Sequence, residues 1–165
     1  MSGTFTVVRT LGRSDAAHDI LEELPEWFGI DRFTHEYVEA AAKFPNYVAV
    51  APPEGGADGG ETPFEDVLGV LLVDQRYPTS AEVHLLAVRR KHHRAGIGRT
   101  LLERVEQDLR AQGVRLLSVK TFGPSASDPD FDRTRAFYTA CGFHPVEEFP
   151  DLWVDNPCLL MVKPL

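Results

Sequence analysis

A predicted strand, a basic turn and a glycine-containing helix start follow one another between residues 83 and 102, and this segment constrains the fold most. Residues 81–88 are apolar and β-branched enough for a buried strand. From residue 96 to 112 apolar side chains recur one helical turn apart, and Gly113 is placed to end that helix. A strand that leads through a turn into a helix begins a strand-helix-strand unit, so we expect a mixed α/β fold.

The rest of the chain adds elements to this unit. Apolar spacing predicts a helix that Ser14-Asp15 caps and Pro25 stops. The segment 52–63, almost entirely Gly, Pro, Asp and Glu, predicts a flexible connection within one domain that covers residues 1–165. Further helices are predicted at 33–44 and 132–141, and further strands at 5–9, 47–50, 67–73, 114–120, 143–149 and 158–162.

The charge of the chain limits its partners. With 17 Lys and Arg against 25 Asp and Glu, the net charge of -8 disfavours binding to a nucleic-acid backbone. The two cysteines match neither a disulfide framework nor a metal site, and no apolar run reaches the length of a membrane span. We therefore expect a cytoplasmic protein, monomeric or homodimeric, with no metal and no membrane partner.

Basic residues are nevertheless concentrated in the turn before the predicted helix, which points to a small anionic ligand. Amides at a helix N-terminus bind phosphate well, and Gly96 and Gly98 lack the Cβ atoms that would keep a diphosphate away. Arg94 and Arg99 add charge-assisted hydrogen bonds. A phosphate-binding P-loop is excluded because no Lys follows Gly98, and a dinucleotide fingerprint is excluded because Leu101 stands where a small residue is required.

Two motifs resemble the GCN5-related N-acetyltransferase family. His93-Arg94-Ala95-Gly96-Ile97-Gly98 is similar to its motif A, Q/R-x-x-G-x-G/A, with His93 at the Gln/Arg position. Residues 134–143, which contain Phe137-Tyr138 and end in Gly142-Phe143, resemble its motif B. The resemblance implies a mixed, mostly antiparallel central sheet of about 6–7 strands with a splayed parallel pair and four flanking helices.

The resemblance also implies acetyl-CoA as cosubstrate and direct transfer of the acetyl group to a primary amine, with no metal. Backbone groups of Leu86, Ala87 and Val88 correspond to those that bind pantetheine, and Tyr138 to the tyrosine that protonates the coenzyme A sulfur. The residues expected around the diphosphate are His93, Arg94, Ala95, Gly96, Ile97, Gly98, Arg99 and Thr100.

The acceptor amine must lose a proton before it attacks the thioester. A subset of the family uses a glutamate at the position of Glu82, and His84 lies two residues further along the same strand face. Histidine has the better intrinsic pKa for neutral pH, whereas Glu82 would need burial. Glu82, His84 and water alone all remain candidates. Cys141 has no histidine partner in the sequence and is expected to be a buried spectator.

Trp27 and Phe28 are expected in a loop between the first two helices, where they either wall the acceptor site or anchor the loop in the core. Acidic residues around them would favour a cationic acceptor. The leading prediction is N-acetylation of a small-molecule amine. The alternatives are acetylation of a protein Lys or N-terminus, and a catalytically silent acyl-CoA-binding module.

Overall fold

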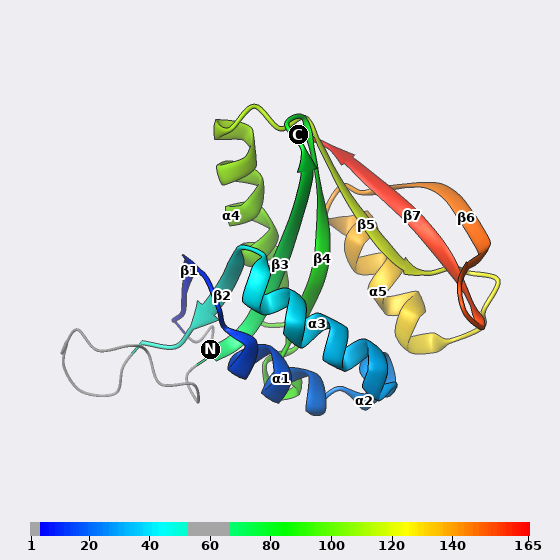
Figure 1. Ribbon diagram of the computed structural model, residues 1–165, viewed down its shortest axis with the longest axis horizontal. Helices are drawn as coiled ribbons and strands as arrows, with labels where there is room; N and C mark the ends of the chain where they lie inside the picture. Colours follow the sequence, from blue (N-terminus) through cyan, green and yellow to red (C-terminus); the bar gives the residue numbers. More distant parts are fainter. Residues whose placement is uncertain (1–3, 53–66) are drawn as a thin grey trace. The chain divides into compact units, whose positions relative to one another are not determined.

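The structure, a computed structural model, describes residues 4–52 and 67–165. Its strands form one seven-stranded sheet in the order β1-β2-β3-β4-β5-β7-β6 (Figure 1). β4 and β5 pair in parallel, whereas β1 with β2, β2 with β3, β5 with β7 and β6 with β7 are antiparallel. The predicted fold class is thereby confirmed. The strands are β1 (Thr6–Thr10), β2 (Asn46–Val50), β3 (Val67–Tyr77), β4 (Ser80–Val88), β5 (Leu116–Phe122), β6 (His144–Trp153) and β7 (Asn156–Pro164).

The described residues form two compact units, and β3 and β4 contribute to both. The first unit comprises the described residues of 1–73 and 85–105, and the second comprises 74–84 and 106–165. Most of the segment 52–63, predicted to be a flexible connection, lies outside the described residues. Within those residues no helix is long and apolar enough to cross a membrane.

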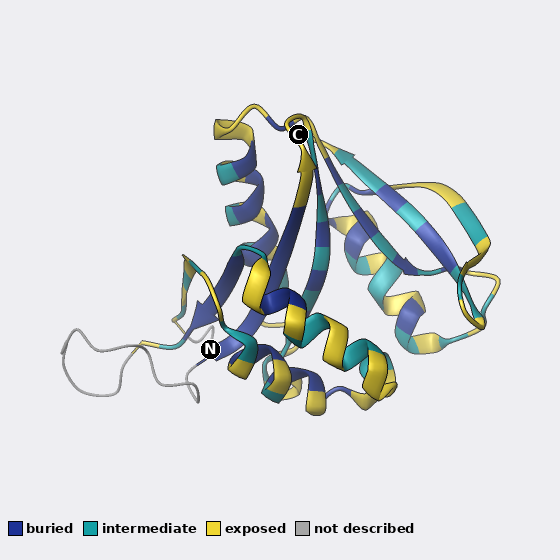
Figure 2. Cartoon of the chain, viewed as in Figure 1, coloured by how far each residue is buried: buried dark blue, intermediate teal, exposed yellow. Residues whose placement is uncertain are grey.

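The first unit packs helices against the buried strands β2 and β3 (Figures 1 and 2). Its helices are α1 (Ser14–Glu22), α2 (Pro25–Phe28), α3 (Asp31–Lys43) and the first turns of α4 (Ile97–Ala111). Every residue of β2 is buried, as are residues 67–73 of β3. Apolar side chains of α1 and α3 close this core: Ala16, Ala17, Ile20, Leu21, Ala40 and Ala41.

The start of α1 and the segment after it differ from the prediction. Arg13, not Ser14, precedes the helix, and the Ser14 hydroxyl donates to the Val38 carbonyl of α3 at 2.9 Å. Pro25 does not simply end a helix; it begins the one-turn helix α2, because proline has no N–H to lose at a first helical position. Trp27 and Phe28 therefore lie in a helix and not in the predicted loop.

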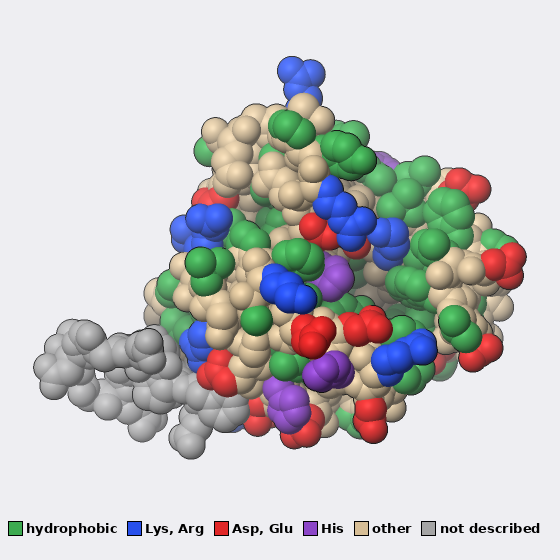
Figure 3. Space-filling model, in the orientation of Figure 1, with side chains coloured by type: hydrophobic (Ala, Val, Ile, Leu, Met, Phe, Trp, Pro, Cys, Tyr) green, Lys and Arg blue, Asp and Glu red, His purple; other side chains and the backbone are tan. Residues whose placement is uncertain are grey.

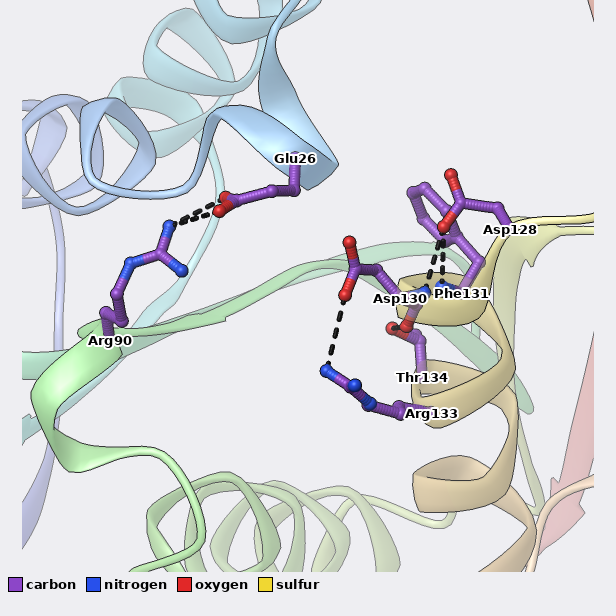
Figure 4. Close-up of polar contacts among 7 residues, drawn as sticks. All are labelled: Glu26, Arg90, Asp128, Asp130, Phe131, Arg133 and Thr134. Atoms are coloured by element: carbon purple, nitrogen blue, oxygen red, sulfur yellow. Dashed lines mark hydrogen bonds and ion pairs between the residues drawn. The ribbon is translucent and has the colours of Figure 1, made fainter.

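In the second unit, α5 (Pro129–Ala140) packs against β5, which pairs with β7. The predicted start of this helix at residue 132 is wrong by one turn. The Asp128 carboxylate accepts hydrogen bonds from the amides of Asp130, at 2.9 Å, and Phe131, at 3.4 Å (Figure 4). Asp128 is thus an N-cap, and Pro129 is the first helical residue.

Candidate functional site

The turn between β4 and α4 contains two residues with positive φ. Arg94 has φ 61° and Gly96 has φ 81°, on either side of Ala95. All three are exposed, whereas Ile97 is 2% exposed and belongs to the core. These left-handed residues stand immediately before α4, whose first amides point along the helix axis toward the turn and have no intrahelical carbonyl as acceptor. This is the arrangement that favours an anion.

His93 is fixed within this turn. Its Nε2 atom is 2.7 Å from the Val88 carbonyl oxygen, and the Trp27 ring contacts its imidazole edge to face, with centroids 5.9 Å apart. Thr100, predicted around the diphosphate, donates through its hydroxyl to the Gly96 carbonyl at 3.0 Å. His93 and Thr100 therefore hold the turn in shape, while Arg94 and Arg99 are exposed beside it.

Gly69 of β3 permits a close approach to this turn. A Cβ atom at Gly69 would lie 3.1 Å from Ile97 Cγ2 and 3.2 Å from the Ala87 carbonyl oxygen. The first side chain of α4 thus sits directly on the strand beneath it. Since Ile97 is buried there, only its backbone is available to a ligand.

The basic residues that open the turn are neutralised by α1 and α2. Arg89 is 6% exposed; its guanidinium pairs with Asp19 at 2.5 Å and with Glu23, and donates to the Val67 carbonyl at 2.6 Å. Arg90 donates to the Glu26 carboxylate at 2.7 Å (Figure 4), which lowers the pKa of Glu26. These two arginines join the turn to the helices, so much of the acidic charge near Trp27 is already paired.

The residues predicted to handle protons lie in the second unit. β4 alternates buried and half-buried residues, which places Glu82 and His84 on one face. Its parallel partner β5 brings Lys120 to the same face, because Glu82 is directly opposite Ser118 in the register. Lys120 Nζ forms an ion pair with Glu82 Oε2.

We call the set Asp74, Arg76, Glu82, His84 and Lys120 the charged strand face. Arg76 pairs with the buried Asp74 at 2.7 Å. Burial lowers the pKa of His84 below its usual value near 6.5; Glu82 and Asp74 oppose this shift, and Arg76 and Lys120 reinforce it. The imidazole is therefore neutral at pH 7. Figure 3 shows basic, acidic and histidine side chains gathered over β3, β4 and β5.

Tyr138, the predicted acid, is buried on α5, with 6% of its surface exposed. Its ring meets Phe143 edge to face, with centroids 5.4 Å apart, and Phe137 at 5.2 Å. Burial raises the pKa of the Cys158 thiol, and Cys141 is also buried, which agrees with neither being a nucleophile. No group of three or more possible metal ligands occurs in the described part of the chain.

Phe28, predicted to wall the acceptor site with Trp27, lines a cavity of about 570 Å³ among the helices of the first unit. Its ring contacts Tyr37 edge to face, with centroids 5.7 Å apart. Trp27 is not among the lining residues and packs on His93 instead. The cavity is lined by Leu21, Pro25, Phe28 and Val38 with His18, Glu22, Asp31 and His35.

Sequence reasoning overlooked Lys120, Asp74 and Arg76. Ser118 and Lys120 alternate with buried residues in β5 as Glu82 and His84 do in β4, and that shared alternation was the available signal. It does not give the register between strands, which is what brings Lys120 to Glu82.

The acetyltransferase (GNAT) family model matches residues 17–143. No curated protein matches the chain. Among solved structures, an acetyltransferase of this family from Desulfovibrio desulfuricans has a TM-score of 0.73 at 18% identity, covering 98% of this chain and 99% of that one. The ribosomal-protein-S18-alanine N-acetyltransferase of Escherichia coli has a TM-score of 0.70 at 17% identity over 98% and 94%.

An aminoglycoside 6'-N-acetyltransferase complexed with coenzyme A has a TM-score of 0.68 at 18% identity, covering 96% of both chains. At such identities these structures establish the shared fold. The family match covers the turn before α4 and all of residues 134–143, the stretch that resembles motif B. The chain therefore belongs to the acetyltransferase (GNAT) family.

Proposed function

We propose that the protein is an acetyl-CoA-dependent N-acetyltransferase that moves the acetyl group directly to the primary amine of a small molecule. The observation that carries this proposal is the turn before α4. Arg94 and Gly96 adopt positive φ there and present the start of the helix within a segment that the family model matches. The diphosphate of coenzyme A is the natural ligand of such a helix start.

Both backbone groups and side chains would contact the coenzyme. The amides of Ile97, Gly98 and Arg99 bind the diphosphate, and the exposed guanidiniums of Arg94 and Arg99 add charge. Leu86, Ala87 and Val88 bind pantetheine through their backbone groups, in keeping with the buried Ala87 side chain. The aminoglycoside enzyme of similar fold is complexed with coenzyme A, which agrees with this choice of cosubstrate.

We assign the proton acceptor to His84. Its imidazole is neutral at pH 7, whereas one carboxylate oxygen of Glu82 is already engaged by Lys120. The acceptor ammonium gives a proton to His84, directly or through one water, and the free amine attacks the thioester carbonyl carbon. The C–S bond then breaks, and the thiolate takes a proton from the Tyr138 hydroxyl. The second proton of the acylated nitrogen returns to the Tyr138 phenolate, so the one proton released by the reaction is held by His84.

Acetylation of a protein Lys or N-terminus is the alternative, because the fold is shared with an enzyme named for an alanine of ribosomal protein S18 as well as with an aminoglycoside enzyme. A catalytically silent binding module is less well supported, since the charged strand face and Tyr138 are both present.

A thiol-release assay with acetyl-CoA against small amines and peptides tests the proposal, together with calorimetry on coenzyme A. We expect coenzyme binding and turnover with at least one small amine. Coenzyme binding without turnover of any amine or peptide would contradict the enzymatic function, and the absence of coenzyme binding would contradict the assignment of the turn.

A further inference from the structure

The charged strand face carries no net charge. Asp74 pairs with Arg76 and Glu82 pairs with Lys120, while burial keeps His84 neutral. A polycationic acceptor would add uncompensated positive charge beside Lys120 and Arg76, and partly buried charges without partners are costly. An acceptor that carries one positive and one negative charge would leave the net charge of the face at zero.

The Glu82–Lys120 pair is accessible and can be exchanged. The Glu82 side chain is 22% exposed and that of Lys120 is 32% exposed, so neither charge is sealed in the core. An ammonium on Glu82 and a carboxylate on Lys120 would replace the mutual contact of the pair, so each partly buried charge would keep a partner of opposite sign. The Asp74 carboxylate is less accessible to a ligand, because it is buried and paired with Arg76.

The two charges also match a particular kind of ligand. An ammonium and a carboxylate separated by one carbon atom present opposite charges side by side, as Glu82 and Lys120 do. If the ammonium contacts Glu82, it lies on the strand face that carries His84, the proposed base, because residues 82 and 84 project from β4 in the same direction. The carboxylate then faces Lys120.

We propose that the acceptor is a zwitterionic amino acid, with Lys120 as the specificity-determining residue that binds its carboxylate and Glu82 binding its ammonium. This inference rests on the proposed function and names its substrate class. It also disfavours a protein N-terminus, since the corresponding carboxylate there has become an amide and would leave Lys120 without an anionic ligand.

The test compares each of the twenty standard amino acids with its amide in the thiol-release assay. Losing a charge-assisted hydrogen bond is expected to lower kcat/KM for the amide about 10- to 100-fold. Lys120→Met should abolish this preference, mainly through KM for the amino acid, and Lys120→Arg should retain it. Lys43→Met removes an exposed lysine on α3 and should leave the preference unchanged.

The outcomes separate this inference from the proposed function. Turnover of amides as fast as amino acids, turnover of other amines only, or an unchanged preference in Lys120→Met would overturn the zwitterion assignment while leaving the acetyltransferase intact. Failure to acetylate any amine would refute the proposed function and the inference with it. The comparison in the unmodified enzyme decides the question even if Lys120→Met does not fold.

Discussion

At the scale of single residues, the role proposed for Tyr138 depends on its phenol hydroxyl. Tyr138→Phe keeps the ring against Phe143 and removes only the proton donor. We expect kcat to fall about 10- to 1000-fold with little change in coenzyme affinity, the range of one general acid. Steady-state kinetics and calorimetry measure both quantities. Tyr77→Phe makes the same change at an exposed position and should be silent; equal turnover in both variants would remove Tyr138 from the mechanism.

His84 makes stability depend on pH in a definite direction. Because burial lowers its pKa, the unfolded chain takes up a proton at the usual value near 6.5 while the folded chain resists. The contribution of His84 to the free energy of unfolding is therefore complete above pH 6.5. It is lost as the pH falls from there toward the lowered pKa, by at most about 1.4 kcal/mol per pH unit.

Urea unfolding at pH 7.5 and 5.5 tests this dependence. His84→Gln should lose less stability than the unmodified protein between the two pH values. His144→Gln, at an exposed histidine, should keep the full loss. Identical losses in His84→Gln and the unmodified protein would show that His84 is not protected from protonation.

The sequence indicated candidate site residues more readily than the contacts that those residues make. The glycines of the turn were identified because their spacing at a helix start restricts the backbone. The contacts of Arg89 with Asp19 of α1 and with Glu23 after that helix were not predicted, since they join positions 70 and 66 residues apart and no local sequence pattern indicates them. Lys120 was overlooked for the same reason.

At the scale of elements, two neighbouring arginines connect the turn to α1 and α2, and they differ in how far each side chain is buried. Arg89 is buried with three partners, whereas the side chain of Arg90 is half exposed. We expect Arg89→Met to lower the free energy of unfolding by roughly 2 kcal/mol, because a buried carbonyl and two carboxylates lose their donor. Arg90→Met should cost less than about 1 kcal/mol.

Urea unfolding of the two variants measures this difference. Both lose one positive charge, so each controls for the effect of net charge in the other. Equal costs would mean that burial of Arg89 contributes nothing to the attachment of the helices.

The bounds of a helix could be predicted where apolar side chains recur over many residues. They were harder to predict where a capping residue sets the start of the helix. α4 was predicted within a residue or so because buried side chains recur along it, from Ile97 to Leu109. α2 was missed because four residues are too few for periodicity, and α5 was started one turn late because the N-cap role of Asp128 was overlooked.

At the scale of the whole molecule, a chain of net charge -8 is proposed to bind an anionic coenzyme. Binding of an anionic coenzyme requires only local positive charge, which the helix amides of the turn, Arg94 and Arg99 would supply. Arg89 and Arg90 are instead paired with acids. The acidic net charge makes the local group of basic residues stand out in the sequence, but it could not show which of these arginines are already paired with acids.

A single domain over residues 1–165 remains a prediction, and the two tryptophans can test it. Trp27 lies in the first unit and Trp153 in the second, so Trp153→Phe and Trp27→Phe leave one reporter in each. If the units unfold together, both reporters share one thermal midpoint. Coenzyme A at 100 times its Kd should raise both midpoints by about 5–10 °C, since such binding contributes about 2.7 kcal/mol.

Gly98→Val provides the control for this shift, because a branched side chain at the second residue of α4 would occupy the diphosphate position. We expect Gly98→Val to unfold with one midpoint that coenzyme A does not move, whereas Gln107→Val, at an exposed position of the same helix, should keep the shift. Separate midpoints for the two reporters would show that the units unfold independently. A full shift in Gly98→Val would mean that the coenzyme binds somewhere other than the start of α4.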